Sequence, residues 1–155
     1  MAEEVLKAMK YPNAVIKVVK AAIEHHEDFS SYMGSSIPRP AVIRQFVSKF
    51  EGNERALDVC LNLIHANNIT QMYGKKIKQV PGIREKLAEM EKKNESGKKI
   101  VLPCDGKEVM KLTGLKAGPT LGVIMSKIKN KVIENPHLTK DEALSFAVEY
   151  LKAIV

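Results

Sequence analysis

Apolar residues recur three and four positions apart along most of this chain, which is the spacing of one face of an α-helix. The clearest apolar stripes are Ile43, Phe46, Val47 and Phe50; Leu57, Cys60, Leu61 and Ile64; and Leu121, Ile124, Met125, Ile128 and Val132. No pair of segments shows the alternation with a period of two that neighbouring β-strands would show. The sequence therefore predicts an all-α fold, a compact multi-helix bundle of about six to seven helices.

Capping residues mark where several of these helices begin. Asn53 precedes the second stripe and belongs to the favoured N-cap residues. Asp105 with Glu108, and Thr139 with Glu142, have the spacing of a capping box, in which each side chain accepts a backbone N–H of the other residue. We therefore expect helices to start at these three places.

A change of composition near residue 97 divides the chain into two lobes. The charged segment 82–94, whose glutamates and lysines alternate four residues apart, is expected to form a solvent-facing helix. It belongs to a helical body lobe over residues 1–96, whose third helix is expected to run toward Tyr73 and end at Gly74. Residues 97–155 form the helical tail lobe. A length of 155 residues with a hydrophobic fraction of 45% allows a core to form without disulfides or metal.

The charge of the chain favours a polyanionic partner such as RNA. Lysine and arginine number 25 against 18 acidic residues, which gives a formal charge of +7 and a pI near 9.4. Basic surfaces bind nucleic acid because each phosphate contact releases counterions. The same excess would also serve solubility alone.

Cysteine usage and the N-terminus predict a reduced, cytoplasmic chain. Cys60 and Cys104 lie far apart and belong to no metal-binding or redox motif. The acidic start of the sequence, residues 1–4, lacks the apolar region of a signal peptide. No apolar run approaches the roughly 18 residues that a membrane span needs. We therefore expect no membrane partner.

The turn from Gly114 to Gly122 is the most informative local feature, because it joins two expected helices with three glycines and a proline. Gly114 permits a left-handed helix cap, and Gly118 permits close approach of the backbone to a neighbour. The amides of Thr120, Leu121 and Gly122 are expected to lack intrahelical partners, so that together with Lys116 they could hold a phosphate. A tight helix connection that packs internally is the equally good alternative.

Histidines raise a second alternative, a degenerate metal-dependent phosphohydrolase of the HD class that would use His25, His26 and His65. Such a site needs an adjacent His-Asp pair, whereas His26 is followed by glutamate. Asn67 is a neutral and therefore poor replacement for a carboxylate ligand. We therefore expect buried polar contacts here, with no metal site, no cofactor and no catalytic residue.

Three segments of the tail carry a family resemblance: Asp105-Gly106-Lys107-Glu108-Val109-Met110, the turn Gly114 to Gly122, and Thr139-Lys140-Asp141-Glu142-Ala143-Leu144. They resemble the C-terminal region of bacterial class II tRNA nucleotidyltransferases, a family that includes bacterial poly(A) polymerases. Upstream, Tyr11-Pro12-Asn13, Ile43-Arg44-Gln45-Phe46 and residues 58–67 look like the family's middle section, which often contains an HD-like helical region.

The resemblance implies the body and tail that grip tRNA by its backbone. Nothing in the sequence matches the family's catalytic head with its Gly-Gly and Asp-x-Asp motifs, so we expect a fragment or a headless relative that would need a separate nucleotidyltransferase head for nucleotide addition. The expected function is RNA binding, and the remaining alternative is a protein-interaction module with an apolar surface near its first helix. The expected phosphate-binding residues are Arg44, Lys49, Lys116, Gly118, Thr120 and Gly122.

Overall fold

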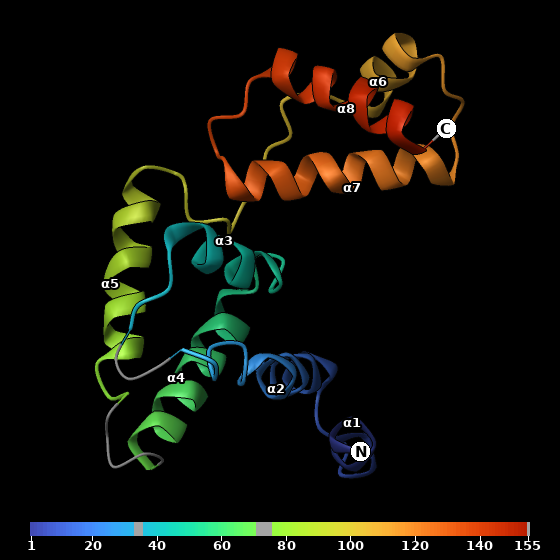
Figure 1. Cartoon of the computed structure of the whole chain (residues 1–155). Coiled ribbons are helices and arrows are strands. Elements are labelled where there is room, and N and C mark those ends of the chain that lie inside the picture. Colours follow the sequence, from blue (N-terminus) through green and yellow to red (C-terminus); the bar gives the residue numbers. More distant parts are fainter. Residues whose placement is uncertain (33–35, 71–75, 155) are drawn as a thin grey trace. The chain divides into compact units, whose positions relative to one another are not determined.

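The structure is a computed structural model that describes residues 1–32, 36–70 and 76–154 (Figure 1). The described residues form eight helices and no strands, which confirms the all-α prediction and slightly exceeds the expected six to seven helices. The helices are α1 (Ala2–Ala8), α2 (Asn13–His25), α3 (Pro40–Ser48), α4 (Glu54–Thr70), α5 (Gln79–Lys92), α6 (Gly106–Thr113), α7 (Pro119–Glu134) and α8 (Lys140–Ile154). None of the helices in this part of the chain is long and apolar enough to cross a membrane.

Two compact units make up the chain, which we name the body unit (Met1–Lys98) and the tail unit (Lys99–Val155). In the body unit α2 packs along α4, α1 packs on α2, and α5 contacts both α3 and α4. In the tail unit α6, α7 and α8 all contact one another (Figure 1). Each unit therefore has a hydrophobic core of its own.

The core of the body unit contains the apolar stripes that the sequence predicts for α3 and α4. The Asn53 side chain accepts the backbone N–H of Ala56 at 3.0 Å, which confirms the predicted cap at the start of α4. At its other end α4 is described as far as Thr70, and its expected end near Tyr73 and Gly74 lies outside the described residues.

Helix α5 is not the solvent-facing helix that its alternating charges predict. Its buried residues are Gln79, Val80, Ile83, Leu87 and Met90. The apolar members of this set lie three and four positions apart, so they form a complete helical stripe facing α3 and α4. The prediction was wrong because it weighed the charges of the segment and overlooked the apolar stripe between them.

Both predicted capping boxes are present in the tail unit. Asp105 accepts the N–H of Glu108 at 2.8 Å and donates its own N–H to the Glu108 carboxylate at 3.1 Å. Thr139 and Glu142 exchange the equivalent bonds at 3.3 and 2.8 Å. These caps fix the first turns of α6 and α8 and thereby place the apolar faces of both helices toward α7.

The caps predict that acid weakens the tail unit. The pKa of Glu108 is lowered, chiefly by its bond to the Lys140 ammonium, and that of Glu142 by the Thr139 N–H. A carboxyl whose pKa is depressed on folding stabilises the fold above its unfolded value of 4.5, and this contribution disappears as the pH falls through the folded value. The unfolding free energy of the wild type should therefore exceed that of an E108Q/E142Q variant at pH values above the unfolded pKa of 4.5, and the difference should shrink as the pH falls through the lowered pKa values of the folded chain.

Urea denaturation of both proteins across this pH range measures the difference. The isosteric glutamines keep a hydrogen-bond acceptor at each cap but carry no charge, so the comparison isolates ionisation. A difference that stays constant with pH would contradict the expected role of the two carboxylates.

Candidate functional site

The turn between α6 and α7 lies on the surface of the tail unit. Helix α6 ends at Gly114, whose φ of 72° is the left-handed cap predicted for this glycine. The chain is exposed from Lys116 to Thr120, and α7 begins at Pro119, the first helical position expected for this proline. Since no side chain caps this end of α7, its first backbone donors are presented to solvent.

Three amides at the start of α7 were predicted to lack a hydrogen-bond partner. Those of Thr120 and Leu121 have none among the described residues. The prediction was wrong for Gly122, whose N–H donates to the Gly118 carbonyl at 3.2 Å. Gly122 is the fourth residue of α7, where the regular hydrogen bond of the helix is already formed. The donors that remain are therefore two neighbouring amides at the positive end of the helix dipole.

The two later glycines of the turn have open space around them. A Cβ on Gly118 would come no closer than 4.0 Å to another atom, the Lys116 carbonyl oxygen, and one on Gly122 would meet no atom of the described chain within 4 Å. The close approach expected at Gly118 is therefore not made within the chain. Glycine inside a helix costs about 1 kcal/mol relative to alanine, and the packing around Gly122 gives no steric reason for this cost.

Lysines without acidic partners among the described residues lie in the turn and along α6. Lys116 lies in the turn, Lys111 is in the last turn of α6, and Lys107 is in its first turn. All three side chains are exposed, and none forms an ion pair with a residue in the described part of the chain. These ammonium groups therefore give the region around the turn a positive potential that is not neutralised locally.

A second basic feature of the tail unit combines lysines with aromatic rings, and sequence reasoning missed it. The Lys127 ammonium lies 6.0 Å from the centroid of the Tyr150 ring, and that of Lys131 lies 4.6 Å from the Phe146 ring. The two rings are themselves 5.9 Å apart. The signal was a shared spacing of four residues on α7 and on α8. Periodicity assigned both rings to the core, and the structure agrees in part, because both are half-buried and pack against the core of the tail unit.

The two basic residues predicted in the body unit are placed differently from those of the turn. Arg44 lies outside the apolar stripe of α3, and this position predicts that its side chain faces solvent. That prediction is wrong, because only 8% of Arg44 is exposed. Burial lowers its pKa, an effect that the charge of Glu95 opposes. Lys49 is bonded to Asp28 at 2.8 Å. Burial of Arg44 and pairing of Lys49 both argue against a strong phosphate contact at this position.

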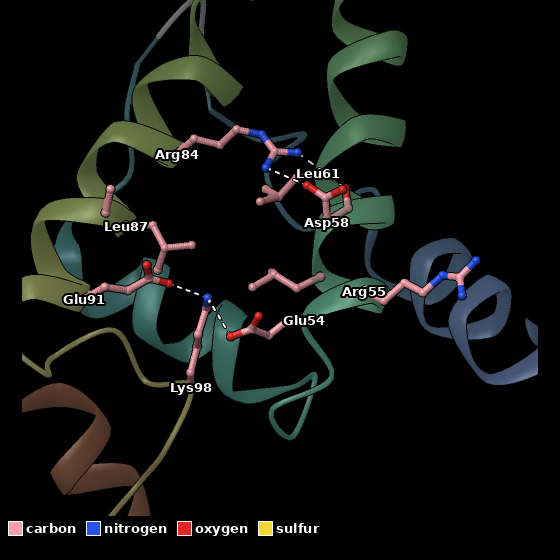
Figure 2. A pocket seen from close by; sticks show the side chains of 10 residues that line it. Glu54, Arg55, Asp58, Leu61, Arg84, Leu87, Glu91 and Lys98 are labelled. Carbon is pink, nitrogen blue, oxygen red and sulfur yellow. Dashed lines mark hydrogen bonds and ion pairs between the residues drawn. The ribbon is translucent and has the colours of Figure 1, made fainter. Parts of the chain in front are cut away.

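A groove of about 480 Å³ between α4 and α5 is the largest hollow we describe in the body unit (Figure 2). We name it the α4–α5 groove; its lining residues are Glu54, Arg55, Leu57, Asp58, Leu61, Arg84, Leu87, Ala88, Glu91 and Lys98. Figure 2 shows that the Arg55 side chain extends away from the other labelled groups. Leucines form the apolar part of the lining, and charged side chains of both signs form the rest.

The cations that point into the α4–α5 groove are already neutralised. Lys98 bonds to both Glu54 and Glu91, and the first of these distances is 3.2 Å. Arg84 bonds to Asp58 at 2.7 Å (Figure 2), and it also donates to the Asn62 side chain at 2.8 Å. Three carboxylates at the rim would repel a polyanion. The groove is therefore a poor site for RNA phosphates.

The three histidines of the proposed phosphohydrolase site do not share a common binding partner among the described residues. His25 lies 3.4 Å from the Asp28 carboxylate, and its ring meets that of Phe50 edge-on. His26 donates from Nδ1 to the Ile23 carbonyl at 2.6 Å. His65 Nδ1 is buried and has no hydrogen-bond partner in the described chain. In the described residues no group of three or more His, Cys, Asp or Glu is arranged to hold a metal ion, so the phosphohydrolase alternative gains no support.

Neither cysteine is poised to act as a nucleophile. Both side chains are buried free thiols. Burial, followed by the charge of Asp28, raises the pKa of Cys60 to about 12. Burial and then the charge of Glu108 raise that of Cys104. Since the thiolate is the reactive form, both groups stay protonated and unreactive near neutral pH.

The structure thus brings together one group of the predicted phosphate-binding residues. Lys116, Gly118, Thr120 and Gly122 form one exposed turn of the tail unit, whereas Arg44 and Lys49 belong to the body unit. No protein-family model, curated protein or solved structure matches the chain. The resemblance to class II tRNA nucleotidyltransferases therefore stays a prediction.

Proposed function

We propose that the chain is an RNA-binding helical module that holds the phosphate backbone of RNA, with tRNA as the expected partner, on its tail unit. The observation that carries the proposal is the start of α7, where the Thr120 and Leu121 amides have no hydrogen-bond partner among the described residues and the exposed Lys116 lies in the preceding turn. Amides at a helix N-terminus bind phosphate because the helix dipole adds to their hydrogen bonds. Lysine adds a positive charge that contacts the phosphates of the backbone whatever the base sequence is.

The open space at Gly118 and Gly122 supports the same proposal. A side chain at either position would stand between the start of α7 and a bound ribose-phosphate chain, whereas the bare backbone allows close approach. The binding of RNA at this position would then offset the loss of helix stability that Gly122 causes. Nothing in the described chain packs on these two glycines, whereas Leu115 and Leu121 of the same turn pack against the core of the tail unit, so the turn also makes the internal contacts that the packing alternative expects.

The lysine–aromatic cluster of α7 and α8 offers a second contact to the same partner. Unpaired bases stack on aromatic rings, and neighbouring cations hold the phosphates that connect them. Tyr150 and Phe146 with Lys127 and Lys131 supply both kinds of group. In line with the family resemblance, a separate nucleotidyltransferase head would perform any nucleotide addition on the RNA held here, in the reducing cytoplasm where Cys60 and Cys104 remain thiols.

One observation favours the protein-interaction alternative as a second candidate function. Helix α1 buries no residue, and the exposed fractions of Val5, Met9 and Tyr11 are 52%, 61% and 45%. Apolar groups exposed close together are typical of interaction sites. A head domain that docks on α1 would bury this surface.

Binding of tRNA at several salt concentrations tests the proposed function. We expect the affinity to fall steeply with salt, and a K107Q/K111Q/K116Q variant should bind more weakly, with a slope of log K against log salt reduced by up to about 3. Fluorescence anisotropy with labelled tRNA measures both quantities. The matched control is K10Q/K17Q/K93Q, which removes the same charge from exposed positions of the body unit and should change the slope much less.

Gly122→Ala separates the turn from charge effects. It should raise the stability of the tail unit by up to about 1 kcal/mol and yet weaken tRNA binding. Equal effects of the two lysine triples, or no tRNA binding at low ionic strength, would overturn the proposal. A chain that binds no tRNA but self-associates or captures a head domain would favour the interaction module.

A further inference from the structure

A small cavity in the body unit lies beside a buried lysine. It has a volume of about 100 Å³ and sits where the turn after α2, the end of α4 and the residues before α5 meet. Its polar lining consists of His26, Ser30, Asn67, Asn68 and Lys76. We name it the Lys76 cavity.

Lys76 is buried without a counterion. Its side chain is only 8% exposed, and its ammonium donates one hydrogen bond, to the Ser30 carbonyl at 2.7 Å. It forms no ion pair with any described residue, and the segments 33–35 and 71–75 contain no aspartate or glutamate. An ammonium carries three N–H donors, and a buried charge is costly unless an opposite charge neutralises it.

The acidic residues between His26 and Ser30, two residues that line the cavity, are engaged elsewhere. Asp28 bonds to Lys49 and lies beside His25. The Glu27 carboxylate lies 3.8 Å from His26 Nε2, and its side chain is 77% exposed. Neither therefore supplies the missing negative charge at Lys76.

A network of buried amides holds the backbone of Lys76 in place. Asn68, 8% exposed, donates to the Lys76 carbonyl at 3.4 Å and to the Gln79 side chain at 3.1 Å. Gln79 is fully buried and donates in turn to the Ser36 carbonyl at 3.3 Å. The ammonium is thus held at the cavity wall by groups that would have to rearrange together before it could move to solvent.

We propose that the Lys76 cavity binds a phosphate-sized oxyanion, which supplies the counterion that the chain lacks. The ammonium of Lys76 has donors left for an anion, and Asn67 adds a polar side chain from α4. A water needs roughly 10–15 Å³ of such space, so the cavity holds a tetrahedral oxyanion with room to spare. It falls well short of the roughly 300 Å³ of sites for larger organic ligands. The site lies in the body unit and does not depend on the proposed RNA contacts of the tail unit.

Thermal unfolding of the full chain in sodium phosphate and in sodium chloride of equal ionic strength tests the proposal. Phosphate should raise the unfolding midpoint of the body unit saturably, by about 5–10 °C at a concentration about tenfold above the Kd, and chloride should not. Broadening of the phosphate ³¹P resonance on the wild-type chain gives an independent measure of binding. A second titration with ethyl phosphate separates the possible sources, since equal affinity indicates the terminal phosphate of a larger molecule and weaker binding indicates the free ion.

Lys76→Met identifies the site, because it keeps the apolar stem and removes the charge. The phosphate response should be lost in this variant and kept in Lys78→Met, whose side chain is exposed two residues away. It should also be kept in K107Q/K111Q/K116Q, which alters only the tail unit. A wild-type chain without saturable phosphate binding, or a Lys76→Met variant that keeps it, would overturn the proposal; should that variant not fold, the ³¹P titration of K107Q/K111Q/K116Q, which keeps the Lys76 cavity and lacks the lysines of the proposed tail site, decides.

Discussion

Replacing Phe46 by alanine is expected to lower the free energy of unfolding of the body unit by about 3–5 kcal/mol. Only 2% of Phe46 is exposed. Its ring centroid lies 4.6 Å from that of Phe29 and 5.1 Å from that of Phe50, so it occupies the middle of a row of three rings. Its removal deletes buried apolar surface and leaves a void that the two flanking rings, held by the turn after α3 and the turn after α2, cannot close. Urea denaturation followed by circular dichroism measures the loss.

Two comparisons make the Phe46 experiment specific. Phe46→Leu keeps most of the volume and should cost far less than alanine. Hydrogen exchange followed by mass spectrometry should show faster exchange throughout the body unit and little change in α7 and α8, because each unit has its own core. A loss below about 1 kcal/mol in the alanine variant, or an equal loss of protection in the tail unit, would contradict this picture of the core.

Local patterns were enough to predict the helices and most of their ends. Asn53, Gly114 and Pro119 each act within three or four residues, so their roles follow from the sequence around them. The capping boxes at Asp105 and Thr139 are local in the same sense. The stripes of α3, α4 and α7 were predictable because apolar side chains at helical spacing have one way to be buried together.

Burial of charged residues could not be predicted in the same way. Arg44 follows Ile43 on α3, and periodicity assigned it to the exposed face. The chain at Gly97 passes against the backbone of Arg44 and helps to cover this face, and this contact joins residues more than fifty positions apart. The buried face of α5 was missed for a different reason: its apolar stripe is present in the sequence at helical spacing, but the many charges of the segment were given more weight.

The candidate sites also differ in how far the local sequence determines them. The turn from Gly114 to Gly122 was predictable because a glycine–proline connection before a helix determines its own geometry, apart from the hydrogen bond of the Gly122 amide. The Lys76 cavity and the α4–α5 groove were not predictable, because each is assembled from separate helices. Asn67 illustrates the difference: the sequence indicated a polar group near the end of α2, but not the buried cation beside it.

Gly97→Ala is expected to destabilise the body unit by about 2–4 kcal/mol, because two independent costs coincide. The φ of Gly97 is +80°, a conformation that costs a residue with a Cβ about 1–2 kcal/mol. In addition, the Cβ would lie 2.8 Å from the carbonyl oxygen of Arg44 and 3.2 Å from its Cα. These are backbone atoms of α3, so relief requires movement of the helix or of the chain at Gly97, and no side-chain rotation is sufficient.

Gly52→Ala is the matched control within the same unit. Gly52 has nearly the same φ, +79°, but its Cβ would meet only the Lys98 carbonyl oxygen at 3.7 Å, which is an ordinary contact. This variant should therefore show the conformational cost alone, about 1–2 kcal/mol, and the excess in Gly97→Ala should report the contact with α3. Denaturant unfolding of both variants gives the two numbers. Equal losses would mean that the chain at Gly97 does not press on the Arg44 backbone, and that the burial of Arg44 has another cause.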